Sequence, residues 1–343
     1  MPKQIVDVNG FEIGGNRCYL IADVGSNHKQ DLSLAKESID AAAEAGANAV
    51  KFQSINLEGL YQAPDQATAD FIRQLEFPED WHQELAEYSK AKGVVFFSSP
   101  TYPKAVDLLE EVEVPLYKLA SAQVGTFPQM VERVASLNKP TIFSTGIANY
   151  EEVTKAVQIF EQAGNDQYII LHCNSIYPVP AEKVNMPLMD TYKAMFGCPV
   201  GFSDHTNGIH IPLAAVARGA KVIEKHFTLD KNFDTPDSTS FAADPLEFGL
   251  LAQQVRELED ALTRREPRLD IQVQEKSFKD SIIYRTRLNK DIAEGQDITY
   301  SDLDYIRHNE GIDAREAFHH RQFGRAKTNL RKGEMLKKED LLK

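Results

Sequence analysis

The feature that most constrains this chain is a repeated alternation of short apolar segments with longer amphipathic ones across residues 18–262. The short segments are rich in β-branched and aromatic residues, as buried strands are, and apolar residues recur at helical spacing after each of them. Gly, Pro or Asn marks the joints. Strands are therefore expected at residues 18–24, 49–55, 94–100, 116–122, 140–146, 168–175, 200–206 and 221–229, each followed by a helix.

Eight strand–helix units in about 245 residues come close to the roughly 250 residues of a closed parallel barrel. An open doubly wound sheet is the alternative, because eight strands suit both architectures. No GxGxxG pattern follows the first strand, as a dinucleotide-binding sheet would require. The sequence therefore favours a (β/α)8, or TIM, barrel over residues 1–264.

The character of the chain changes after Arg265. Residues 265–281 are polar and predict a linker, and residues 282–343 contain short strand and turn patterns that predict a small β-rich domain. Two phrases in this domain, beginning at Asn289 and Asn329, share an apolar residue, a Gly turn and an Asp-Leu ending, which indicates an internal pseudo-repeat. Because roughly 60 residues bury little surface, we expect this domain to dock onto a partner surface.

Composition narrows the class of protein. The chain has 42% hydrophobic and 26% charged residues, as globular proteins do. It contains no apolar run of about 20 residues, and its start lacks a secretion signal. A net charge of −13 argues against nucleic acid or a membrane surface as the main partner. Three scattered cysteines without metal-type spacing predict a reduced, cytoplasmic protein.

Two histidines stand at matching heights at the ends of the seventh and eighth expected strands. Side chains alternate faces along a strand, so His205 shares the barrel interior with Ser203, and His226 shares it with Glu224. Both imidazoles could reach one divalent cation at about 2.0–2.2 Å; the alternative is a pair of hydrogen-bonded core histidines. Two protein ligands leave positions open for substrate and water, which suits a catalytic metal. Asp204 faces the other way, where a structural hydrogen bond is expected.

Lys51 and Lys118 end the second and fourth expected strands. Serine hydroxyls also lie near the ends of the expected strands, at Ser99, Ser121, Ser144 and Ser203. Two fixed cations with hydroxyl donors predict a site for a phosphate and a carboxylate. The alternatives are a Schiff base on either lysine, as in barrel aldolases, or plain buried ion pairs.

Asp23 and Glu224 are the carboxylates best placed to orient a sugar hydroxyl or to move protons. The alternative is that they neutralise Lys51 and Lys118. Cys173 is expected to be a small packed residue rather than a nucleophile, since no activating pair is evident.

These segments together resemble the sialic acid synthase (N-acetylneuraminate synthase) family. The resemblance is carried, in order, by IADVGSNH, AVKFQ, FFSSP, YKLAS, FSTG, LHCNSIYP, GFSDHT and VIEKHFTLDK. The final segment resembles that family's antifreeze-like (SAF) domain through RLNKDIAEGQ, YIR and FGRAKTNLRKGEMLKKEDL. The resemblance covers essentially the whole chain.

The resemblance implies an enzyme that condenses phosphoenolpyruvate with an N-acylated hexose to a nine-carbon 2-keto-3-deoxy acid and phosphate. It implies that His205 and His226 bind a metal that polarises the acceptor aldehyde, with Mn²⁺ expected and Mg²⁺ or Co²⁺ as alternatives, and that Asp23 and Glu224 are catalytic. Phosphoenolpyruvate would be held by Lys51, Ser99, Lys118, Ser121, Ser144 and Ser203. Further substrate-binding positions would be Gln53, Asn174, Ser175, Tyr177, Asp237 and Arg307.

Family members form homodimers in which the small domain of one subunit covers the barrel of the other. The resemblance therefore implies that Arg307 reaches across to the acceptor's acyl group. Synthases of seven- or eight-carbon keto-deoxy acids are the nearest alternative, but they would lack the small domain. A non-catalytic homologue that binds an anionic sugar is a further alternative.

The chain departs from the family pattern on the acceptor side. Asp23 and Gln123 stand where Glu is usual, Ser175 stands where Asn is usual, and residues 308–311 replace a usual Pro-Gly-Thr. The phosphoenolpyruvate side is intact, so the sequence predicts ordinary phosphoenolpyruvate chemistry with an altered acceptor. Residues 224–238 look somewhat closer to the pseudaminic acid branch.

Overall fold

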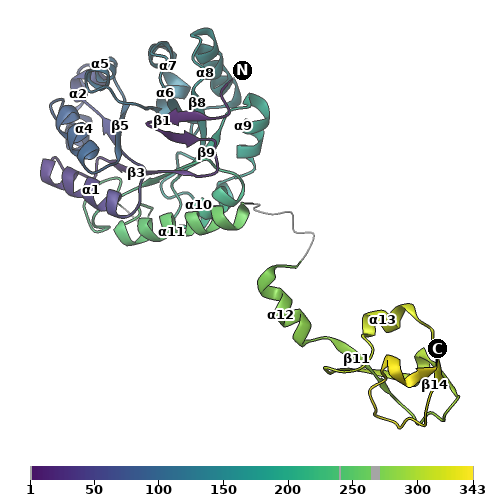
Figure 1. The fold of residues 1–343 in the computed structure, drawn as a ribbon. Helices are drawn as coiled ribbons and strands as arrows, with labels where there is room; N and C mark the ends of the chain where they lie inside the picture. Colours follow the sequence, from purple (N-terminus) through teal and green to yellow (C-terminus); the bar gives the residue numbers. More distant parts are fainter. Residues whose placement is uncertain (1, 239–240, 264–270, 343) are drawn as a thin grey trace. The chain divides into compact units, whose positions relative to one another are not determined.

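The computed structural model describes residues 2–238, 241–263 and 271–342 (Figure 1). The chain forms two compact units, Met1–Thr263 and Arg264–Lys343, here called the barrel unit and the C-terminal unit. Within the described ranges, no helix combines the length and the apolar character needed to cross a membrane.

Eight parallel strands form the centre of the barrel unit. They are hydrogen-bonded in the order β5-β4-β3-β10-β9-β8-β7-β6, and β5 and β6 also lie side by side, which brings the two ends of the sheet together. The predicted (β/α)8 barrel is therefore confirmed, and the open doubly wound alternative is excluded. The strands are β3 (Tyr19–Gly25), β4 (Ala49–Ser54), β5 (Val95–Pro100), β6 (Tyr117–Leu119), β7 (Thr141–Ser144), β8 (Tyr168–Cys173), β9 (Val200–Asp204) and β10 (Val222–His226).

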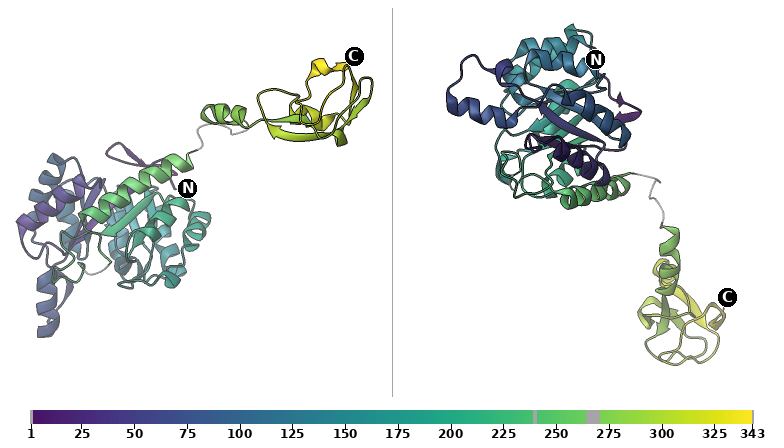
Figure 2. Two further views of the ribbon diagram at one scale, coloured as in Figure 1. Left: turned by 90° about the horizontal axis from the view of Figure 1, so that it is seen from below. Right: turned by 90° about the vertical axis from the view of Figure 1, so that its left-hand side faces the viewer.

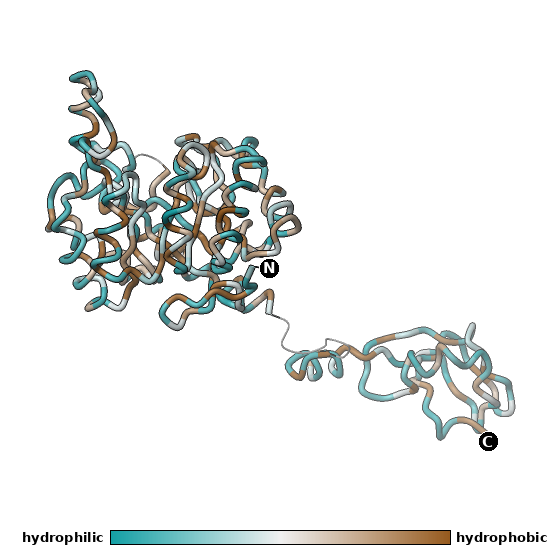
Figure 3. Tube along the Cα trace, turned by 90° about the horizontal axis from the view of Figure 1, so that it is seen from above, coloured by the Kyte–Doolittle hydropathy of each residue, from teal (hydrophilic) through white to brown (hydrophobic). Residues whose placement is uncertain are grey.

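Helices surround these strands (Figure 2), and hydrophilic and hydrophobic segments alternate along them (Figure 3). The main ones are α1 (Leu32–Glu44), α4 (Trp81–Ala91), α5 (Pro103–Glu111), α6 (Ser121–Thr126), α7 (Pro128–Ser136), α8 (Tyr150–Gln162), α9 (Leu188–Phe196), α10 (His210–Ala217) and α11 (Pro245–Leu262). A single turn, η1 (Ala181–Lys183), precedes α9. Polar residues fix several helix starts: Asp31 accepts hydrogen bonds from the first turn of α1, and Asn149 forms a capping box on α8.

Two further helices, α2 (Leu57–Leu60) and α3 (Gln66–Leu75), lie between β4 and α4. The sequence placed only one helix in this unit, beginning near Pro78. The extra helices are short, and α3 buries only Ala69 and Ile72. These residues join Ile55 and Leu57 in a small cluster of their own, separate from the main core of the barrel unit.

The barrel interior is apolar in the half that lies toward the amino-terminal ends of the strands. Inward-facing residues of the strands form one cluster with the antiparallel hairpin of β1 (Val6–Val8) and β2 (Phe11–Ile13), which was not predicted. The hairpin contributes Val6, Val8 and Ile13 to this cluster, so it closes the amino-terminal end of the barrel. Space is tight there: a Cβ on Gly201 would lie 2.4 Å from the carbonyl oxygen of Val222.

The next inward positions toward the carboxyl ends of the strands are polar. They are occupied by Asp23, Lys51, Ser99, Lys118, Ser144, Cys173, Ser203 and Glu224, all buried. The parallel register places Asp23 beside Lys51 and Ser203 beside Glu224. Side-chain alternation along eight parallel strands thus gathers the polar groups at one end of the barrel.

The C-terminal unit is β-rich, as expected. Its strands are β11 (Tyr284–Leu288), β12 (Asp297–Thr299), β13 (Leu303–Arg307), β14 (Gln322–Ala326) and β15 (Leu341–Leu342), with helices α12 (Val273–Ser281) and α13 (Ala314–His319) and the turns η2 (Tyr300–Asp302) and η3 (Lys338–Asp340). Part of the predicted linker, residues 265–270, lies outside the described residues. Helix α12 occupies most of the remainder.

The two phrases of the predicted pseudo-repeat pair with each other in this unit. Ile292 and Leu330 exchange backbone hydrogen bonds across an antiparallel bridge. Gly295 and Gly333, three residues further in each phrase, both have positive φ, which explains the shared Gly turn. Ile292 and Leu330 also belong to the core of the unit, so the repeated apolar positions are the buried ones.

Candidate active site

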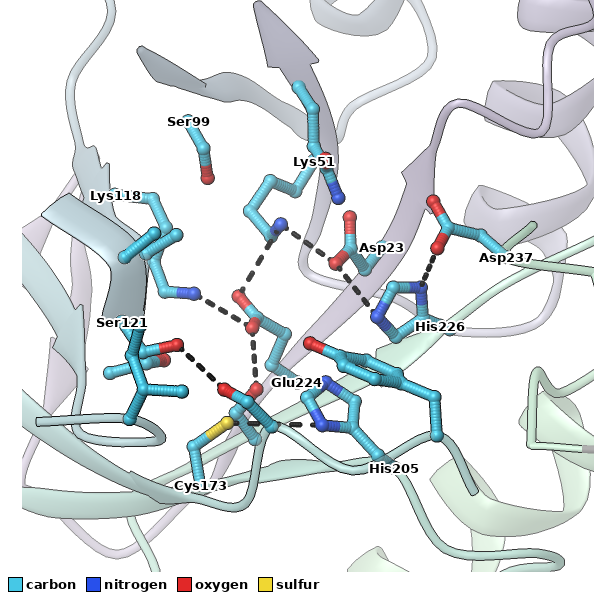
Figure 4. A pocket seen from close by; sticks show the side chains of 18 of the residues that line it. Asp23, Lys51, Ser99, Lys118, Ser121, Cys173, His205, Glu224, His226 and Asp237 are labelled. Atoms are coloured by element: carbon cyan, nitrogen blue, oxygen red, sulfur yellow. Dashed lines mark hydrogen bonds and ion pairs between the residues drawn. The ribbon is translucent and has the colours of Figure 1, made fainter. Parts of the chain in front are cut away.

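A cavity of about 350 Å³ opens among the polar residues of the barrel (Figure 4). Its lining includes most of the side chains that the sequence predicted, namely Asp23, Lys51, Gln53, Ser99, Lys118, Ser121, Ser144, Ser175, Tyr177, Ser203, His205, Glu224, His226 and Asp237. Two predicted residues lie elsewhere. Asn174 is absent from the lining, and Arg307 belongs to the C-terminal unit, at the end of β13.

Both lysines form buried ion pairs with the two predicted carboxylates. The Nζ of Lys51 lies 2.7 Å from Oδ2 of Asp23 and 3.9 Å from Oε2 of Glu224. Lys118 donates to Oε1 of Glu224 over 2.8 Å, and Ser203 donates to the same oxygen. The sequence left open whether these carboxylates neutralise the lysines, and in the structure they do.

The pairing fixes the charge of these groups. Burial alone would lower the pKa of Lys51, but Asp23 and Glu224 raise it above its ordinary value. Burial would likewise raise the pKa of Glu224, but Lys118 and Lys51 lower it to about 2. Lys51 is therefore held as an ammonium group, and an imine on it would first require loss of a proton that its neighbours hold.

Several buried polar atoms of the cavity have no hydrogen-bond partner among the described residues. They are the hydroxyls of Ser99 and Ser144, Oδ1 of Asp23, Oε2 of Glu224 and Nδ1 of His226. A buried polar atom without a hydrogen bond costs about 1–3 kcal/mol, so such atoms are rare unless a ligand satisfies them. The two hydroxyls line the same cavity as the two lysines, as an anion site requires.

His205 is held in one tautomer by the backbone. Its Nδ1 lies 2.7 Å from the carbonyl oxygen of Asn174, which can only accept, so Nδ1 carries the proton and Nε2 keeps its lone pair. Burial, together with the neighbouring His226, lowers the pKa of His205 to about 3, so the ring is neutral. Asn174 thus acts on the site through its main chain, whereas the sequence placed it among the substrate-binding residues.

The second histidine faces the first, with ring centroids 5.2 Å apart. Nε2 of His226 lies 3.7 Å from Asp23, and its Nδ1 lies 3.8 Å from Oδ1 of Asp237. Two facing imidazoles, with the Nε2 lone pair of His205 left available, fit a divalent cation. Among the described residues, no three His, Cys, Asp or Glu side chains are grouped to hold a metal, so a cation here would complete its coordination with water or substrate oxygens.

The outer wall of the cavity is built by Tyr177 and Asp237. The ring of Tyr177 packs against His205 with 4.2 Å between the ring centroids, and Tyr177 is 53% exposed. It therefore forms a part of the outer wall that a ligand can contact. Asp237 approaches the backbone at Gly25: a Cβ there would lie 2.6 Å from Oδ2 of Asp237, and φ is +55°. Glycine is therefore required at this position.

Ser175 lies closer to the predicted anion site than the resemblance implied. Its hydroxyl is 3.1 Å from that of Ser121. Both press against Gly146, where a Cβ would lie 2.3 Å from Oγ of Ser175. Thr101 and Ile147, which the sequence analysis did not identify, also line the cavity; both follow an expected strand end, and that position was the available signal.

Two smaller predictions are also settled by the geometry. Asp204 points away from the cavity and accepts from Thr206 and Lys225, as the expected structural hydrogen bonding requires. Cys173 is buried, and burial raises the pKa of its thiol to about 11. It is therefore a protonated, packed residue at neutral pH.

The fold and the cavity define a (β/α)8-barrel enzyme whose pocket combines two lysine ammonium groups, free hydroxyls and two facing histidines. Residues 38–267 match the NeuB family. The chain belongs to this family, and the resemblance to sialic acid synthases is confirmed.

Named relatives and solved structures agree. The chain is 37% identical to the N,N'-diacetyllegionaminic acid synthase of Campylobacter jejuni over 86% of this chain and 92% of that one. It is 34% identical to the pseudaminic acid synthase of the same species, over 94% and 96%. The sialic acid synthetase of Leptospira borgpetersenii superimposes with a TM-score of 0.74 at 33% identity, covering 81% of this chain and 96% of that one. Homologues of this chain are thus synthases of nonulosonic acids.

Proposed function

We propose that the protein condenses phosphoenolpyruvate with an N-acylated hexose to a nonulosonic acid and phosphate, for surface polysaccharide biosynthesis. The observation that carries this proposal is the meeting, in one cavity, of the paired ammonium groups of Lys51 and Lys118 with the unpartnered hydroxyls of Ser99 and Ser144. Phosphoenolpyruvate is a small trianion and would satisfy all four groups. Ser121 and Ser203 complete this anion site.

The acceptor sugar would bind on the side of the two histidines. Gln53, Tyr177 and Asp237 line the cavity there, and the carbonyl of Asn174 orients His205. Ser175, also in the lining, contacts Ser121 of the anion site. C3 of phosphoenolpyruvate attacks the aldehyde carbon of the open-chain sugar, water adds at C2, and the C2–O bond to phosphate breaks. The reaction consumes one water and releases one inorganic phosphate.

The chain's own residues manage the charges and protons of this reaction. Lys51 and Lys118 balance the carboxylate and the phosphate, and Glu224, shared by both lysines, fixes their positions. Asp23 has one free carboxylate oxygen and would accept a proton from the attacking water or a sugar hydroxyl. A cation held by His205 and His226, Mn²⁺ by preference over Mg²⁺ or Co²⁺, would polarise the aldehyde as a Lewis acid.

We further propose that the C-terminal unit is an antifreeze-like (SAF) domain, that the protein is a cytoplasmic homodimer, and that each C-terminal unit covers the partner's barrel. Arg307 supports this proposal. Its guanidinium lies over the ring of Tyr284, 5.4 Å from the centroid, and no carboxylate pairs with it in the described residues. An arginine held in this way is available to a ligand's acyl or hydroxyl oxygens.

The test is release of inorganic phosphate from phosphoenolpyruvate with Mn²⁺ across N-acetylmannosamine and 2,4-diacetamido hexoses. Turnover with one of them is expected, and turnover restricted to a 2,4-diacetamido sugar would identify the legionaminic or pseudaminic branch. Tight phosphoenolpyruvate binding without turnover on any acceptor would refute the synthase proposal.

A further inference from the structure

A buried ion pair lies on the outer face of β9 and β10, behind the two histidines. The Nζ of Lys225 is 2.6 Å from Oδ2 of Asp204, and the two residues are direct partners in the parallel register. Their exposed fractions are 1% and 0%. Burying two charges removes both from water, and their mutual attraction only partly offsets that loss of solvation, so stability alone is a weak reason for such a pair.

The pair belongs to a ring of hydrogen bonds that encloses His205. Oδ1 of Asp204 accepts from both the backbone N and Oγ1 of Thr206, at 2.9 and 2.7 Å. Lys225 also donates to the carbonyl oxygen of Thr206 over 2.5 Å. His205 stands between Asp204 and Thr206, one residue beyond the end of β9, where the sheet no longer holds the backbone.

The same ring reaches the second histidine. Lys225 lies between Glu224 and His226 on β10, and its side chain points outward while theirs point into the cavity. A main chain held firmly at Asp204 and Lys225 therefore also fixes the backbone positions of the next residues, His205 and His226, from which the two imidazoles point inward. Metal sites need their ligands held to within about 0.5 Å, and supporting hydrogen bonds supply that precision.

We propose that Asp204, Lys225 and Thr206 are positioning residues that set the separation of His205 and His226 so that both can bind one divalent cation. The inference rests on the metal role proposed above for the two histidines. It assigns to this outer ring a function in metal affinity, in addition to its contribution to packing.

A matched control exists on another strand pair of the same barrel. Ser54 of β4 bonds to His82 and to Ser98 of β5, at 2.8 Å each, and all three are buried on the outer face. This link flanks Gln53 and Ser99 and is remote in the strand order from β9. Ser54→Ala removes a buried polar link of the same kind without touching the ring at Asp204.

The experiment titrates metal-free protein with Mn²⁺ alone and, separately, with phosphoenolpyruvate alone, by calorimetry. The double variant Asp204→Asn/Lys225→Met removes both charges at once, so that neither is left unpaired. Its Mn²⁺ affinity should fall at least about tenfold, while its phosphoenolpyruvate affinity should stay within about threefold of the parent. Ser54→Ala should keep the parent's Mn²⁺ affinity.

A second readout needs no metal. In ¹⁵N-histidine spectra of the metal-free protein, the ring signals of His205 and His226 should be shifted or broadened in the double variant relative to the parent, because the main chain that carries both rings is less firmly held. A double variant that is folded, binds Mn²⁺ like the parent and keeps the parent's histidine ring signals would overturn the inference.

Thr206→Val keeps the proposal falsifiable if the double variant does not fold. This near-isosteric change removes one hydrogen bond of the ring, so Mn²⁺ binding should weaken about threefold; unchanged affinity would overturn the inference. Parent protein that binds no Mn²⁺ would instead refute the proposed metal role itself, and with it this inference. Parent binding followed by loss of affinity in the ring variants supports both.

Discussion

The carboxylate of Asp23 lies 2.7 Å from the ammonium of Lys51, and the two residues are direct partners across β3 and β4. Both side chains are almost fully buried, so each supplies the counter-charge that the other needs. The substitution of Asp for the family's usual Glu at this position is therefore compatible with a close ion pair.

Asp23→Asn should destabilise the protein, because it leaves Lys51 with only the more distant Glu224. We expect the free energy of unfolding to fall by about 3 kcal/mol and turnover to fall about a hundredfold. Urea denaturation and phosphate release measure the two effects. Glu84→Gln, which breaks the exposed pair with Lys36, is the control and should change stability by no more than about 0.5 kcal/mol. Equal effects of the two substitutions would contradict the prediction.

Ser99→Ala should affect binding without reducing stability. The hydroxyl of Ser99 is buried and has no partner, so its removal takes no hydrogen bond from the free protein. The KM for phosphoenolpyruvate should rise about three- to tenfold while the melting temperature stays the same or rises. Ser98→Ala, on the outer face of the same strand, removes a bond to Ser54 and should lower the melting temperature instead. A pair of variants with the reverse pattern would show that Ser99 does not face the anion.

His205→Ala should abolish metal-dependent turnover and leave the fold intact. The ring is neutral and its Nε2 is free, so its loss removes a metal ligand without leaving a buried charge. Phosphate release at saturating Mn²⁺ and circular dichroism are the measurements. His210→Ala, at the exposed start of α10, should retain parental activity. Full activity of His205→Ala would refute the metal assignment.

Arg307→Ala should weaken use of the acceptor sugar more than use of phosphoenolpyruvate. Loss of a charged hydrogen bond predicts a rise in the acceptor KM of about tenfold or more. Steady-state kinetics with each substrate varied in turn provide the comparison. Arg325→Ala, an exposed arginine on β14 of the same unit, is the matched control. Equal losses for both substrates would argue against an acceptor role for Arg307.

His28 should make stability depend on pH. It is fully buried with ring contacts to Phe77 and Trp81, and burial lowers its pKa from 6.5 to about 4. The unfolded chain therefore binds a proton on His28 more tightly than the folded protein does. The stability that comes from burying neutral His28 is fully present above pH 6.5 and is lost as the pH falls toward 4. Its size is on the order of 3 kcal/mol.

Replacing His28 tests this dependence. His28→Phe should lose less stability than the parent between pH 7.5 and pH 5, measured by urea denaturation at each pH. Part of the dependence should remain, because burial also lowers the pKa values of His82, His172 and His205. If His28→Phe and the parent lost the same stability between pH 7.5 and pH 5, His28 would be excluded as a contributor to the pH dependence.

The positions of the cavity residues on the strands followed from the sequence by simple geometry. Period-two alternation and a common strand direction placed Lys51, Lys118, His205 and His226 at one end of the interior. The distances among them depend on barrel closure and on side-chain rotamers, which the sequence pattern does not encode. Ser175 shows this: its motif indicated the acceptor side, and its hydroxyl lies on Ser121.

Other features had signals that were overlooked. Asn9-Gly10, both with positive φ, is the turn of the β1–β2 hairpin, and an Asn-Gly pair between apolar residues is a strong hairpin signal. Lys225 was overlooked because its parity points it away from the cavity. An opposite charge at the neighbouring Asp204 could have identified the pair from strand alignment alone.

The hairpin fills the amino-terminal end of the barrel, so a ligand reaches the described cavity from the carboxyl ends of the strands. The depth of the lining residues then sets an order of binding. The anion groups lie deepest, with Lys51 and Lys118 each 2% exposed, whereas Tyr177 at the rim is 53% exposed. A sugar seated at the rim would block the passage below it, so phosphoenolpyruvate has to enter first and the sugar second. The new acid, lying above the phosphate, would then have to depart before the phosphate can.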